Sequence, residues 1–88
     1  MDFSIWGPIA REDLPGLCDR VCTLLRRHEP EIARCDVRSV VVDAVTVDAL
    51  CRLQLAAGRQ GCQVRLRHAS DELRELVAFM GLADVLPD

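Results

Sequence analysis

The chain has 88 residues, of which 50% are apolar and 28% are charged, and its formal net charge is −3 at pH 7. This length suits one small domain with a packed core, so we expect a single domain over residues 1–88. An acidic balance lacks the basic footprint that nonspecific nucleic-acid binding needs. No apolar run approaches the ~20 residues that span a bilayer, so we expect no direct membrane insertion. The N-terminus has no basic segment followed by an apolar stretch, which predicts no signal peptide and a cytoplasmic location.

The cysteines are odd in number, which argues against a complete disulfide framework. They are Cys18, Cys22, Cys35, Cys51 and Cys62. Reduced and mostly buried thiols are the natural interpretation. Cys18 and Cys22 share a helix face, but no CxxC or HxxxH motif of a zinc site accompanies them. We therefore expect no metal and no cofactor, and keep a redox role for this pair as an open alternative.

The first third of the chain predicts a strand followed by a helix. Residues 3–9 (FSIWGPI) are β-branched and aromatic and end in a Gly-Pro turn. In residues 11–30, Glu12 and Asp13 favour a helix start, and Pro30 ends the run. The apolar positions recur at spacings of three and four, at Leu14, Leu17, Cys18, Val21, Leu24 and Leu25.

The middle of the chain predicts a second strand and a second helix. Residues 32–37 (IARCDV) form a short apolar run typical of a buried strand. Residues 40–42 (VVV) could extend that strand or form another short extended piece. The run 43–61 opens acidic, continues with helical periodicity and stops at glycine, as helices commonly do.

The last third predicts a strand, a helix and a short tail. Residues 62–69 alternate, with Cys62, Val64, Leu66 and His68 on one side, as in a strand covered on one face. Ser70 is a suitable cap for a final helix that ends at Gly81. Strands that alternate with helices predict a small, largely parallel sheet with exposed edges, although the first strand could pair differently and make the sheet mixed.

This order and spacing resembles a STAS domain, the family of sulfate-transporter and anti-sigma-factor-antagonist domains. The resemblance runs from about Gly7 to Leu86 of this chain. The chain is also similar to single-domain STAS proteins of actinobacteria. It rests on CDV at 35–37, an apolar stretch to Asp43, an amphipathic helix to Gly61, VRLRHAS at 64–70 and ELRELVAFMGLADVL at 72–86. The resemblance implies a small α/β fold with helices packed on one side of the sheet.

The resemblance also implies a non-catalytic regulatory module that acts through reversible protein contacts. In the sigma-regulating branch, the partner is a kinase-type anti-sigma factor, and phosphorylation at the start of the second helix breaks the complex. In a lipid-transport branch, a free-standing STAS subunit binds the ATPase of an ABC transporter. The first is our leading hypothesis and the second an alternative. A small-ligand or redox sensor is the third.

The phosphoacceptor motif of the family, close to Asp-Ser-Ser-Gly, falls on Asp43, Ala44, Val45 and Thr46. Its serine positions hold alanine and valine, which cannot be phosphorylated. Thr46 is the one hydroxyl of this loop, so either Thr46 substitutes as acceptor or the switch is lost. Thr46 also suits the N-cap of the helix, with Asp48 near the positive end of the helix dipole.

The helix after this loop has a charged outer face with a leucine at its centre. Helical periodicity places Asp48, Arg52, Leu55 and Arg59 opposite the apolar stripe, with the first two spaced for an i,i+4 pair. An apolar centre with an arginine rim is how partner-binding surfaces are built. We therefore expect the partner to contact Asp43, Thr46, Asp48, Arg52, Leu55 and Arg59.

Nothing in the chain resembles a catalytic constellation. Asp43 and Asp48 lie at one helix start, whereas a general acid–base pair needs two different environments in a pocket. The two histidines have no apparent nucleophile beside them, so we expect no enzyme. Trp6 is predicted to lie in the core or to cover a sheet edge. Phe79 lies off the apolar stripe of the last helix, so it could pack under the tail or contribute to a homodimer.

Overall fold

The computed structural model describes residues 1–87, so the last residue of the expected domain, 88, lies outside the description. The chain alternates strands and helices, as its sequence predicts. The elements in order are β1 (Asp2–Trp6), a 3-10 helix η1 (Arg11–Asp13), α1 (Leu14–His28), β2 (Ile32–Ser39), α2 (Ala44–Gly58), β3 (Gln63–Arg67) and α3 (Asp71–Phe79). Among these residues, no helix is both long enough and apolar enough to cross a membrane.

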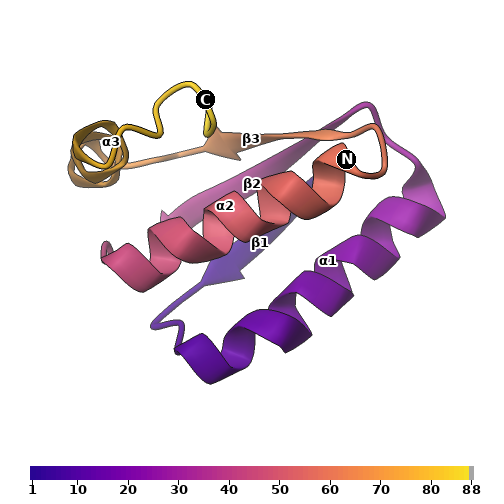
Figure 1. The fold of residues 1–88 in the computed structure, drawn as a ribbon, viewed down its shortest axis with the longest axis horizontal. Coiled ribbons are helices and arrows are strands. Elements are labelled where there is room, and N and C mark those ends of the chain that lie inside the picture. The colour runs from indigo at the N-terminus through magenta and orange to yellow at the C-terminus, as the bar shows by residue number, and fades with distance from the viewer. Residues whose placement is uncertain (88) are drawn as a thin grey trace.

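The three strands form one parallel sheet in the order β1-β2-β3. Phe3 pairs with Cys35, which in turn pairs with Leu66 on the other side. The first strand is thus parallel like the others, and the sheet is not mixed. α1 and α2 lie side by side over one face of the sheet, which confirms an α/β fold with its helices packed against the sheet (Figure 1).

The core lies between the sheet and these two helices. Alternate residues of β2 and β3 point into it because successive side chains of a strand face opposite sides. The buried positions on these two strands are Ala33, Cys35, Val37, Val64 and Leu66. Leu25 of α1 and Leu50 and Leu53 of α2 meet them from the helical layer and are almost fully buried.

α3 lies beyond the carboxyl end of β3 and is seen nearly end-on in Figure 1. Ser70 caps it as expected, because its hydroxyl oxygen accepts a hydrogen bond from the Leu73 N–H at 3.1 Å. Leu73 and Val77 are buried on its inner side. The tail after α3 docks on the body of the domain, since Leu86 is buried.

The outer edge of β3 is closed by a side chain and by this tail. The side-chain amide of Gln54 on α2 accepts from the Val64 N–H and donates to the Val64 carbonyl, both at 2.8 Å. The same amide donates to the Val85 carbonyl at 2.8 Å. The Leu66 N–H donates to the Pro87 carbonyl at 2.8 Å. Gln54 therefore connects α2, β3 and the tail, which the sequence did not reveal.

Residues 40–42 form a loop, so neither extended alternative for them is correct. The Val40 N–H turns back to the Val37 carbonyl at 3.4 Å, and the Val41 carbonyl accepts from the Thr46 hydroxyl at 2.7 Å. The expectation for His68 is also wrong, because this residue has a left-handed φ of 58° and is exposed after β3 has ended.

Trp6 lies on the uncovered face of the sheet, where its side chain is 72% exposed. Of the two predicted places for Trp6, the core is therefore wrong; the residue lies on β1, which is an edge strand. On β1, Phe3 and Ile5 point toward the helices, so strand alternation directs Asp2, Ser4 and Trp6 to the opposite face. The phenyl ring of Phe79 is 89% exposed, so it does not pack under the tail either.

Candidate functional site

Asp43, not Thr46, caps the start of α2. Asp43 has the extended backbone that an N-cap needs (φ −150°, ψ 173°), and its Oδ1 accepts from the Thr46 N–H at 2.8 Å. Thr46 lies three residues further on, already inside the first turn. The interpretation of Thr46 as the N-cap was therefore wrong by one helical turn.

Thr46 is fully buried, which bears on its expected role as a phosphoacceptor and partner contact. Its hydroxyl donates to the Val41 carbonyl at 2.7 Å and so holds the loop before α2 against the helix. A phosphate on this oxygen would break that bond and could not fit without opening the first turn. The acceptor role stays a prediction, and it requires the start of α2 to unfold locally.

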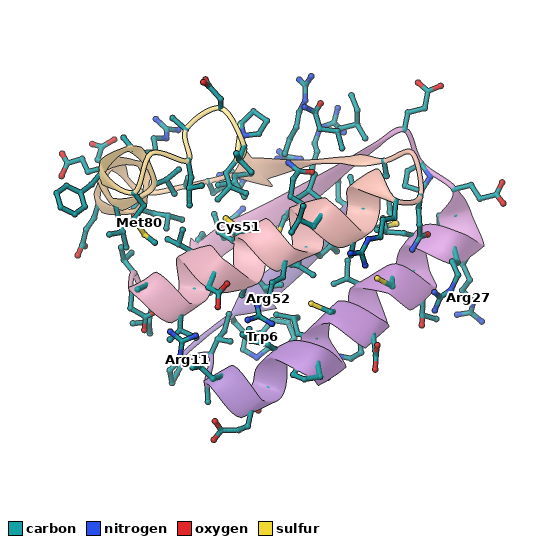
Figure 2. All side chains as sticks on the ribbon, viewed as in Figure 1. Trp6, Arg11, Arg27, Cys51, Arg52 and Met80 are labelled. Atoms are coloured by element: carbon teal, nitrogen blue, oxygen red, sulfur yellow. The ribbon has the colours of Figure 1, made fainter. Side chains whose placement is uncertain are left out.

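The outer face of α2 carries a three-residue charge cluster. Asp48 Oδ1 accepts from Arg52 Nε at 3.2 Å, which confirms the predicted i,i+4 pair. Asp48 Oδ2 accepts from Arg11 Nη1, also at 3.2 Å. Arg11 comes from η1, and Figure 2 shows it and Arg52 along the boundary between α1 and α2. Sequence spacing could not find Arg11, because only the fold brings it next to α2.

Leu55 stands outward on this face with 66% of its surface exposed, as predicted. Arg59 follows it one turn later and is also exposed. We call the group Arg11, Asp48, Arg52, Leu55 and Arg59 the arginine-rimmed face. It contains three cations and one anion, whereas the whole chain has a net charge of −3. Exposed ion pairs contribute only ~0–1 kcal/mol, so these arginines can exchange Asp48 for an acidic partner at little cost.

The six predicted contact residues therefore divide into two groups. Asp48, Arg52, Leu55 and Arg59 lie together on the accessible side of α2. Asp43 is half-buried and Thr46 is buried at the helix start, where both hold the loop in place. The accessible part of the site thus runs along α2 from its second turn to its C-cap, with Arg11 added from η1.

The cysteines are all free, and burial lowers the reactivity of four of them, namely Cys18, Cys35, Cys51 and Cys62. Burial in the core, with a smaller contribution from Asp36, raises the pKa of the Cys35 thiol to about 12. Burial also raises the pKa of the Cys18, Cys51 and Cys62 thiols. The thiolate is both the nucleophile and the metal ligand, so these four groups are poor at either role near neutral pH. Within the part of the chain that the structure describes, no three His, Cys, Asp or Glu side chains are placed to hold a metal.

The chain matches no protein-family model and no curated protein. The resemblance to STAS domains therefore stays a prediction from sequence.

Proposed function

We propose that this protein is a non-catalytic regulatory module that binds a protein partner reversibly through the arginine-rimmed face. The observation that carries the proposal is the position of Leu55. An exposed leucine in the last turn of α2, between Arg52 and the C-cap residue Arg59, has the form of an interface anchor with a polar rim. A matching partner offers an apolar socket surrounded by carboxylates.

The leading partner is a kinase-type anti-sigma factor, as the resemblance to STAS domains implies. In that setting, binding would sequester the anti-sigma factor. The arginine-rimmed face begins one turn after the loop where such partners act on the family, so loop and face could be contacted together.

The second candidate partner is the ATPase of an ABC transporter. The burial of Thr46 favours this alternative, because binding to an ATPase needs no phosphorylation at the start of α2. Incubation with a kinase-type anti-sigma factor and ATP, followed by mass spectrometry, separates the two. Phosphate on Thr46 supports the sigma-regulating version. Unmodified Thr46, or phosphate on another residue, removes the phosphoswitch and leaves the ATPase as the better candidate.

A photo-crosslinking amino acid placed at position 55 tests the proposed surface in cells. We expect it to capture one predominant protein, an anti-sigma factor or a transporter ATPase. Position 79 is a matched control, because Phe79 is even more exposed but lies on α3, away from the arginine-rimmed face. Equal capture of the same protein from both positions, or no capture at position 55, would contradict the proposal.

A further inference from the structure

The two edges of the sheet differ, because one is closed and the other is open. Gln54 and the tail close the outer edge of β3. Over residues 1–87, β1 pairs with β2 alone and has no neighbour on its other side. An open edge strand presents unpaired backbone groups to any chain that can align with it.

A hollow runs beside this open edge. It measures about 600 Å³ and is bounded by β1 and by the side of α1 that is turned away from α2. Phe3 and Ile5 of β1 and the half-buried Leu17 and Leu24 of α1 give it apolar walls. The edge is therefore open in its backbone, and the hollow beside it offers a neighbouring chain apolar side chains together with the charged Asp13 and Arg20.

The side of α1 along this hollow has opposite charges at its two ends. Asp13, Leu17, Arg20, Leu24 and Arg27 follow at spacings of four and three, so they form one stripe along the helix. The stripe starts with a carboxylate and ends with a guanidinium. Figure 2 shows Arg27 at the far end of α1 from Arg11. A second such helix running in the opposite direction would place Asp13 against Arg27 at both ends.

The sequence of β1 is compatible with the same arrangement. In an antiparallel pair centred on Ser4, Asp2 lies opposite Trp6, and Phe3 lies opposite Ile5. No like charges face each other, and the apolar residues meet on the helical side. Arg20 is at the middle of the α1 stripe, but its side chain extends back by one turn. Its Nη1 lies 3.6 Å from the place where a Cβ on Gly16 would stand, so the guanidinium is displaced from the middle of the stripe toward the start of α1.

We propose that the partner of the β1 edge is a second copy of this chain. Two β1 strands pair antiparallel about a dyad, and the two sheets join into one of six strands. The α1 stripes meet above the joint, with Asp13 of each copy facing Arg27 of the other. The arginine-rimmed face lies on α2, so it stays free on both copies, and the dimer does not depend on the proposed function.

Light scattering on the protein as it elutes from a size-exclusion column tests this arrangement. We expect twice the monomer mass of 9.8 kDa at high concentration and a return toward 9.8 kDa on dilution. Arg27→Asp should raise the dimer dissociation constant roughly tenfold, because two ion pairs are replaced by two carboxylate repulsions. Arg26→Asp is the matched control, since Arg26 is exposed on the same turn but outside the stripe.

The double variant Asp13→Arg, Arg27→Asp reverses both charges and should restore the dimer. Circular dichroism on each variant confirms that the monomer fold is kept. A mass of 9.8 kDa at every concentration overturns the proposal. A dimer that tolerates Arg27→Asp as well as Arg26→Asp also overturns it, because such a dimer uses another surface.

Discussion

At the scale of single residues, the start of α2 shows how one short loop can be misassigned. Asp43 and Thr46 are both reasonable caps, and Thr46 also falls within a motif that is phosphorylated in STAS domains. The structure separates their tasks: Asp43 caps the helix, and Thr46 holds the preceding loop from inside. Both tasks are structural, and each can be measured.

Thr46→Val keeps the shape of the side chain but leaves the Val41 carbonyl without its donor. We expect the free energy of unfolding to fall by about 1–3 kcal/mol, the range for a buried polar group left unpaired. Thr23→Val is the matched control, because the Thr23 hydroxyl donates to the Asp19 carbonyl at 2.9 Å on an exposed surface. Urea denaturation measures the free energy of unfolding of both variants. Equal losses for the two variants would mean that burial of Thr46 adds nothing.

Cys35 makes the free energy of unfolding depend on pH in the alkaline range. Burial raises its pKa from an ordinary 9.0 to about 12, so the folded state holds the thiol proton where the unfolded state has lost it. The stability that the protonated, buried thiol contributes is therefore fully present below pH 9 and is lost as pH rises toward about 12. The chain has no tyrosine and no lysine, so the two other kinds of side chain that ordinarily titrate near pH 10 are absent from this window.

Denaturation curves recorded across this window should show falling stability for the native chain. Cys35→Ala should flatten the decline, although it lowers stability at neutral pH by leaving a small cavity. A decline of the same size in the variant would show that Cys35 is not its source.

At the scale of elements, Gln54 is the side chain that fastens three segments. Gln54→Glu keeps the acceptor for the Val64 N–H but turns a carboxylate toward the Val64 and Val85 carbonyls. We expect a loss of about 2–3 kcal/mol, together with faster hydrogen exchange in residues 82–87. Gln60→Glu, on an exposed turn, should change neither. Unchanged exchange in the tail of the Gln54 variant would show that Leu86 and the Leu66–Pro87 hydrogen bond hold the tail without Gln54.

The elements themselves could be predicted because they depend on local rules. The spacing of leucines defined α1, the alternation of residues 63–67 defined β3, and Ser70 marked the start of α3. The misassignments arose where tertiary contacts decide. Trp6 belongs to a strand whose inner side is fixed by Phe3 and Ile5, and residues 40–42 are turned by a hydroxyl three residues into the next helix.

The candidate site was predictable in part for the same reason. The line Asp48, Arg52, Leu55 and Arg59 follows from helical periodicity and appears as expected. Arg11 joins it across 37 positions of sequence. No local pattern connects residues so distant, and a single sequence offers no other signal for their contact.

At the scale of the whole molecule, a sheet covered by helices on one face leaves two surfaces for association. The arginine-rimmed face lies on the helical layer, and the open edge of β1 lies at the side of the sheet (Figure 1). A dimer built on the edge would present two copies of the arginine-rimmed face. Such a module would bind a dimeric or clustered partner more tightly than a monomeric one through effective concentration.

Leu55 is the proposed anchor for the partner, and calorimetric titration with the protein captured at position 55 measures its contribution to binding. Leu55→Asp should weaken binding by at least about tenfold, the scale of an anchor residue, while the exposed position limits the loss of stability to about 1 kcal/mol from helix propensity and the helix dipole. Phe79→Asp, which alters an exposed apolar residue elsewhere, should bind as the native chain does. Unchanged affinity of a folded Leu55→Asp variant would contradict the account.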